Sequence, residues 1–147
     1  MQDQILRECL LQLIKVYAFA EQQCIYTSIQ AQIPILKIFF EQRAFERMSL
    51  MEEIEQLLFT KKEVGPVPKT LEQLYHFHSQ IYGKNALTNI HIANIDSIII
   101  DEKALEICNC LLAGDLNENV SAILKSHSIT LESSILSIVY LKALYED

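Results

Sequence analysis

The chain has 147 residues, of which half are hydrophobic and 21% are charged, and its formal net charge is −7. This length and balance predict one globular domain, residues 1–147, that buries about 70% of the surface its unfolded form exposes. The excess of acids argues against a nucleic-acid or anionic-membrane partner, because both need clustered Lys and Arg. No apolar run approaches the ~20 residues of a membrane span and the first residues lack a basic secretory segment, so we expect a cytoplasmic protein.

The four cysteines are Cys9, Cys24, Cys108 and Cys110. They form no Cys-x-x-Cys pair, so the sequence does not support a zinc finger or a thioredoxin-like centre. Cys108 and Cys110 would point about 200° apart on a helix, where they could share neither a metal nor a disulfide. We therefore expect small buried thiols in a reducing compartment.

Three glycines and three prolines divide the chain into long uninterrupted stretches, which favours helices. In residues 3–30, apolar side chains recur at three- and four-residue steps, the helical period. They are Leu6, Leu10, Leu13, Tyr17, Ala20 and Cys24. Pro34 suits the first turn of a second helix that should run to about Thr60. The short turn between the two predicts an antiparallel hairpin.

A clear break follows at residues 65–68, where glycine and prolines cluster. Thr70 and Gln73 then resemble a capping box. These signals predict a short helix over residues 71–82.

Residues 88–100 are rich in β-branched side chains, which is typical of a strand. A lone strand in a helical chain has no partner, however, and is unstable. We therefore favour a third long helix over residues 94–113, ended by Gly114. A last helix is expected over residues 117–145, with apolar positions at the helical period.

These elements form two hairpins, joined by a connection of roughly thirty residues that carries the short helix. A long crossover between helices two and three is the topology of ferritin-like bundles. The sequence thus predicts an all-α, ferritin-like four-helix bundle. An up-down bundle with one long loop is the structural alternative.

Three segments carry a resemblance to a known family. Residues 34–47 open with a Pro-x-Leu-Lys-x-x-Phe start that leads into acidic and basic residues, residues 70–82 lie where a short crossover helix is found, and residues 117–144 form the last helix. On these segments the chain resembles a bacterial ferritin-like family of uncharacterised function, distantly related to rubrerythrins. The resemblance spans most of the chain. It implies a four-helix bundle of the kind that can hold a carboxylate-bridged metal pair in its core.

The sequence departs from the metal-binding members of this group in one respect. A di-iron bundle takes a Glu from each of two helices and a Glu-x-x-His from each of the other two. This chain contains no Glu-x-x-His. A conventional di-iron site is therefore not expected, and a metal would need a degenerate set of ligands.

Four residues make up that degenerate set, one from each long helix: Glu21, Glu46, Glu102 and His127. Glu21 shares a row with apolar residues, and burying an unpaired carboxylate there would be costly. Glu102 follows two isoleucines and is expected to point at the core, while its neighbour Asp101 could instead cap the helix. His127 lies on the apolar stripe of the last helix, where iron or manganese would find a nitrogen ligand.

Each member of the set also has a simpler interpretation. Glu21 and Glu102 could be boundary carboxylates that reach solvent, and His127 could be a hydrogen-bonded core residue. The run 41–47 could be a solvated face with i,i+4 pairs. If its arginines, Arg43 and Arg47, face inward instead, they would pair with acids on neighbouring helices and fill the room that a metal needs.

Motifs for other chemistry are absent from the sequence, since it has neither a glycine-rich phosphate loop nor a Gly-x-Ser-x-Gly. We therefore favour a structural or interaction module without enzymatic activity or cofactor. The alternatives are an iron- or manganese-binding redox or storage protein, and an unrelated helical adaptor that binds a partner helix. A homodimer is expected to be possible, because the hydrophobic content leaves a helix face to cover.

Overall fold

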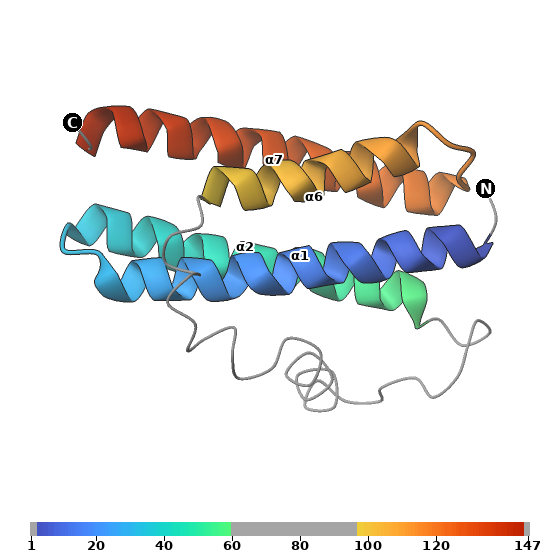
Figure 1. The fold of residues 1–147 in the computed structure, drawn as a ribbon, viewed down its shortest axis with the longest axis horizontal. Helices are drawn as coiled ribbons and strands as arrows, with labels where there is room; N and C mark the ends of the chain where they lie inside the picture. Colours follow the sequence, from blue (N-terminus) through green and yellow to red (C-terminus); the bar gives the residue numbers. More distant parts are fainter. Residues whose placement is uncertain (1–2, 60–96, 146–147) are drawn as a thin grey trace.

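The computed structural model describes residues 3–59 and 97–145. These residues form four α-helices: α1 Asp3–Gln30, α2 Pro34–Leu58, α6 Ser97–Leu112 and α7 Glu118–Tyr145 (Figure 1). No strand occurs in the part of the chain that is described. The expected all-α class with four long helices is therefore confirmed.

The helices pack as two antiparallel hairpins around a common core. α1 lies along α2, α6 lies along α7, and α1 also packs against α6. α2 and α7 make far less contact with each other than these pairs do. Following the sequence colours in Figure 1, α2 and α6 run in the same direction, opposite to α1 and α7.

Local sequence signals explain where the helices begin and end. Pro34 occupies the first turn of α2, where its missing N–H is not needed. Asn117 caps α7, because its side-chain oxygen accepts a hydrogen bond of 2.9 Å from the Val120 amide. α6 ends at Leu112, two residues before Gly114, whose amide donates to the Leu111 carbonyl.

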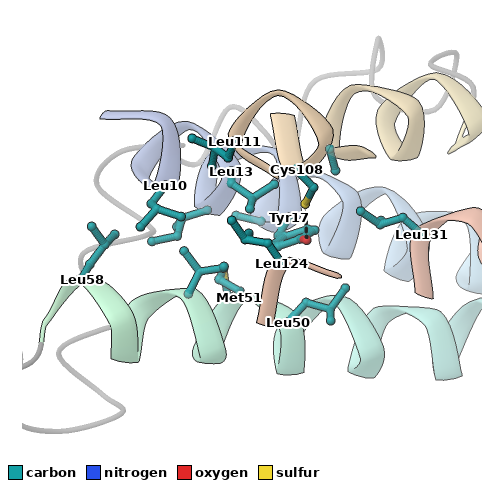
Figure 2. Close-up of a cluster of buried hydrophobic side chains, with 14 of the residues drawn as sticks. Leu10, Leu13, Tyr17, Leu50, Met51, Leu58, Cys108, Leu111, Leu124 and Leu131 are labelled. Atoms are coloured by element: carbon teal, nitrogen blue, oxygen red, sulfur yellow. Dashed lines mark hydrogen bonds between the residues drawn. The ribbon is translucent and has the colours of Figure 1, made fainter. Parts of the chain in front are cut away.

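The core consists of one apolar stripe from each helix (Figure 2). In α1 the predicted stripe is buried apart from Leu6, which is half-buried. In α7 the buried positions are Val120, Leu124, His127, Leu131, Ser134 and Ile138. Leu13, Ile54, Leu124 and Leu131 are fully enclosed. Because burial of large apolar side chains is the main driving force of folding, this core explains the pairing of the two hairpins.

Two expectations lie wholly or partly outside the described residues. The short helix predicted over residues 71–82 is one. The other is the choice between strand and helix at residues 88–100, of which the described part, 97–100, is helical. Among the described helices, none combines the length and the apolar composition that a bilayer crossing requires.

Candidate functional site

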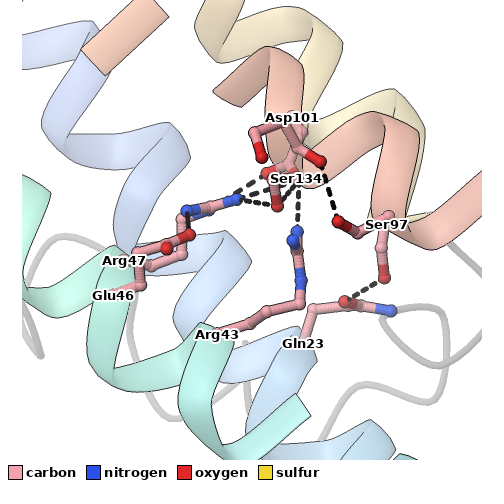
Figure 3. Close-up of polar contacts among 9 residues, drawn as sticks. Gln23, Arg43, Glu46, Arg47, Ser97, Asp101 and Ser134 are labelled. Atoms are coloured by element: carbon pink, nitrogen blue, oxygen red, sulfur yellow. Dashed lines mark hydrogen bonds and ion pairs between the residues drawn. The ribbon is translucent and has the colours of Figure 1, made fainter. Parts of the chain in front are cut away.

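A buried ion pair joins α2 to α6 near the middle of the bundle (Figure 3). The guanidinium of Arg47 donates to both oxygens of Asp101, over 3.1 Å from Nε and 3.0 Å from Nη2. Arg47 is fully buried and Asp101 is 1% exposed. Such a bidentate pair fixes the orientation of both side chains as well as contributing charge–charge attraction.

Two further side chains complete this Arg–Asp cluster, which we define as Arg43, Arg47, Asp101 and Ser134. Arg43, one turn before Arg47, also donates to Asp101. Ser134 on α7 accepts a hydrogen bond of 2.6 Å from Arg47 and donates one of 3.2 Å to Asp101. The cluster therefore connects α2, α6 and α7.

Electrostatics favour the charged state of Arg47 despite its burial. Loss of water around the guanidinium lowers the pKa of Arg47, but Asp101, followed by Glu46, raises it by more, and the pKa ends above its ordinary value. Glu46 accepts a 2.6 Å hydrogen bond from Arg47 and lies at the surface, with its side chain 44% exposed. Two buried guanidiniums are thus balanced by one buried and one half-exposed carboxylate.

A second polar group links the other diagonal of the bundle, from α1 to α7. The hydroxyl of Tyr17 lies 2.8 Å from Nδ1 of His127, and both residues are fully buried. Nε2 of His127 lies 3.6 Å from a carboxylate oxygen of Glu53 on α2. A neutral ring with its proton on Nε2 suits both contacts, because Nδ1 can then accept from Tyr17 while Nε2–H faces the carboxylate.

The thiol of Cys108 on α6 completes this Tyr–His group, at 3.9 Å from the Tyr17 hydroxyl. Burial lowers the pKa of His127 and raises that of Tyr17. Burial likewise raises the pKa of the Cys108 thiol to about 11. All three groups are therefore neutral at pH 7. A thiol in this state is a poor nucleophile, which argues for a packing role.

Carboxylates on α1 and α2 form a third polar feature. Burial, and then the negative charges of Glu52 and Glu21, raise the pKa of Glu55 to about 7. The pKa of Glu21 is raised by burial and by Glu52. Glu55 is only 4% exposed, so its charged form is disfavoured in the folded protein.

The four predicted metal ligands lie in different surroundings. Glu21 is half-buried, Glu46 is at the surface beside Arg47, Glu102 is exposed and His127 is fully buried against Tyr17. In the described parts of the chain, no three His, Cys, Asp or Glu side chains are grouped so as to hold a metal ion. The structure thus does not gather this set into a site, and metal binding by it stays a prediction.

Two expectations need correction. Glu102 does not point at the core; its neighbour Asp101 does, from inside α6 rather than as a cap. The run 41–47 is not a uniformly solvated face, because Arg43 and Arg47 face inward, the alternative considered above. The expectation of buried thiols holds for Cys24 and Cys108, whereas Cys110 is exposed and Cys9 is half-buried.

The sequence does contain a signal for the Arg–Asp cluster. Asp101 lies on the same three- and four-residue steps as the buried Ala104, Cys108 and Leu111. Arg43 and Arg47 continue the buried row of α2 through Leu50 and Ile54 in the same way. Reading charged residues together with the apolar ones at this period would have placed them inside.

An open groove runs between α2 and α7, two neighbouring helices that make few contacts with each other. Its wider part, of about 830 Å³, is lined largely by apolar side chains, among them Ile35, Phe39, Leu136 and Tyr140. A narrower pocket of about 340 Å³ continues it past Phe39 and Ser133 toward Ile129. Arg43 and Ser134 of the Arg–Asp cluster form part of the wall of this narrower pocket.

Comparison of the chain with protein-family models, curated proteins and solved structures finds no match.

Proposed function

We propose that this protein is a non-catalytic, ferritin-like helical bundle that serves as a structural or interaction module and has no conventional di-iron site. The observation that carries the proposal is the Arg–Asp cluster. In a di-iron bundle, carboxylates and histidines from all four helices converge in the core. Here that region holds two buried guanidiniums, whose charge opposes a cation.

The direction of the helices supports the ferritin-like part of the proposal. In an up-down bundle with short loops, each helix is antiparallel to the next one in sequence. α2 and α6 instead run in the same direction (Figure 1). The end of α2 and the start of α6 therefore lie at opposite ends of the bundle, an arrangement that agrees with the proposed long crossover between the second and third long helices.

The chemistry of the remaining polar groups supports a role without catalysis. Tyr17, His127 and Cys108 are neutral and enclosed, so they cannot reach a substrate in solution. Their contacts join α1, α6 and α7, as expected for structural side chains.

Exposed apolar side chains support the interaction part of the proposal. α2 and α7 carry several large hydrophobic residues that are more than half exposed, including Ile35, Phe45, Ile129, Leu136 and Tyr140. Of these, Ile35, Leu136 and Tyr140 line one groove, and an exposed apolar surface of this kind commonly marks a binding site for another protein.

Metal content tests the proposal. The protein would be produced in medium supplemented with iron, manganese and zinc, purified without chelator and measured by elemental analysis. We expect less than about one tenth of an equivalent of each metal. Stoichiometric iron or manganese that is lost in a Glu21→Gln, His127→Gln double variant, but kept in a Glu102→Gln control, would replace the proposal with a metal centre.

A further inference from the structure

The outer face of α7 carries an apolar stripe that its own bundle does not cover. Ile129 and Leu136 are each 69% exposed, Tyr140 is 66% exposed and Leu144 is 57% exposed. Ile129 and Leu136 each lie two positions from buried residues on either side. Two positions on an α-helix are about 200° apart around its axis, so both side chains point away from the core. α7 is therefore apolar on two opposite faces, and a helix of that kind is normally covered on both.

This stripe is almost free of charge, although the chain as a whole carries −7. Between Ile129 and Tyr145 the only charged residues are Glu132 and Lys142. Two copies of an acidic protein repel each other on approach, and the repulsion is least where the local charge is close to zero. The face is thus suited to a partner that is itself acidic, such as a second copy of the chain.

The spacing of the stripe fits a two-fold axis. In an antiparallel pair of α7 helices centred between Leu136 and Ser137, Ile129 of one copy lies opposite Leu144 of the other. Tyr140 lies opposite Ser133, so that a large side chain meets a small one on both sides of the axis. An interface around a two-fold axis needs such self-complementarity.

We propose that a second copy of this chain docks on the α7 stripe, with the two α7 helices antiparallel and the Tyr140 ring of each copy seated over Ser133 of the other. The proposal rests on the proposed function, because it names the partner of the interaction module. Oligomer state and metal content are separate readouts, so either statement can fail alone.

The groove between α2 and α7 of one copy provides the pocket that binds the Tyr140 ring of the other copy. Ser133 borders the pocket of about 340 Å³ whose other walls include Phe39, Gln42 and Ile129. Phe39 and Ile129 offer apolar surface to the ring, while Gln42 and the serine offer partners for its hydroxyl. An aromatic side chain that fills a pocket and satisfies its polar end is the usual anchor of a protein interface.

The exposed area of the α7 stripe agrees with a weakly associated dimer. The exposed surface of Ile129, Leu136, Tyr140 and Leu144 comes to roughly 500 Å², against about 800 Å² that each partner contributes to an interface of standard size. Ser133, Ala143 and, across the groove, Ile35 add to it. We therefore expect a dimer that dissociates on dilution rather than an obligate one.

Sedimentation velocity over about 1 to 200 µM tests the interface. The parent protein should shift from monomer to dimer across this range. Tyr140→Glu should stay monomeric throughout, whereas Ile99→Glu, which places the same charge at an equally exposed position on α6, should dimerise like the parent. A parent that is monomeric at every concentration overturns the proposal. Dissociation by Ile99→Glu and not by Tyr140→Glu overturns it as well, because another face would then hold the copies together.

Cross-linking tests the register without disturbing the fold. In a Cys110→Ser background, Ser137→Cys lies beside the two-fold axis and should form an intermolecular disulfide under mild oxidation. Ser126→Cys, exposed near the start of the same helix, should not. Equal cross-linking of both variants, or of neither at concentrations where the parent is a dimer, would rule out the antiparallel α7 seam.

Discussion

The buried polar residues of this protein show how the same type of side chain takes different roles in different surroundings. Asp101 and Glu55 are both carboxylates with almost no exposure. Asp101 faces two guanidiniums. Glu55 lies near Glu52 and Glu21, and its pKa rises to about 7. We therefore expect Asp101 to hold the hairpins together and Glu55 to make stability depend on pH.

Glu55 should destabilise the fold at high pH. Its pKa is raised in the folded protein, so the folded state binds the proton more tightly than the unfolded state does. The destabilisation is therefore fully present above pH 7 and is relieved as the pH falls toward 4.5. Glu55→Gln should be more stable than the parent at pH 8, and this advantage should shrink by about 2 kcal/mol at pH 5.5. Urea unfolding at both pH values measures the difference.

Comparing Glu55→Gln with the parent also separates the pH dependence of stability due to Glu55 from that due to His127. Burial lowers the pKa of His127, so its contribution to stability is lost as the pH falls below its ordinary value of 6.5, the opposite direction. That loss is common to parent and variant and cancels in their difference. Glu41→Gln, an exposed position on α2, serves as the control for the loss of a surface carboxylate. An advantage of Glu55→Gln that stays constant with pH would refute the assignment.

The helices themselves follow closely from local sequence signals. α1 spans the predicted residues 3–30, and the other described helices begin or end within a few residues of their expected limits. The reason is that breakers are rare in this chain and stand at the helix ends, as Pro34 and Gly114 do. Between such breakers a helical apolar period has no competing structure.

The direction in which the side chains point was harder to predict. On α6 the two apolar residues before Glu102 suggested that it faced inward, but Ile99 is 60% exposed and the buried row runs through Ser97, Asp101 and Ala104. The core stripe of a short helix with apolar residues on several sides is poorly fixed by hydrophobicity alone. Here Asp101 faces inward to pair with Arg43 and Arg47, and that contact connects residues distant in sequence.

The cap of α7 gives a prediction for a single element. Asn117 accepts a hydrogen bond from the Val120 amide, one of the N–H groups that a helix start leaves unpaired. Asn117→Ala should lower the free energy of unfolding by about 1 kcal/mol. Asn119→Ala, an exposed asparagine inside the first turn, should change it by less than about 0.5 kcal/mol. Thermal and urea unfolding measure both variants. If Asn117→Ala and Asn119→Ala lower the free energy of unfolding equally, the cap contributes nothing specific.

At the scale of the whole molecule, polar contacts connect the two hairpins along both diagonals. The Arg–Asp cluster joins α2 to α6, and the Tyr17–His127 hydrogen bond joins α1 to α7. Apolar packing can accept small rotations and shifts of a helix, whereas bidentate ion pairs and hydrogen bonds accept few. We infer that these contacts select one arrangement of the hairpins more than they add to stability.

Two variants test whether the Arg–Asp cluster selects one arrangement of the hairpins or adds to the stability of the fold. Asp101→Asn keeps the shape but leaves two buried guanidiniums without their carboxylate, and should cost about 3–5 kcal/mol in urea unfolding. A triple variant, Arg43→Met, Arg47→Met, Asp101→Leu, removes every charge of the cluster and fills the space with apolar groups. Such replacements are often neutral or stabilising in buried sites, so this variant should unfold within about 2 kcal/mol of the parent.

The structural cost of the triple variant should appear in the docking of the hairpins instead. Without the charged contacts, α6 can rotate or slide against α2, so amide hydrogen exchange in residues 97–112 should quicken while α1 stays protected. If the triple variant is as unstable as Asp101→Asn, the ion pairs contribute net stability and the inference is wrong. If the triple variant is as stable as the parent and amide exchange in α6 is unchanged, apolar packing alone defines how the hairpins meet.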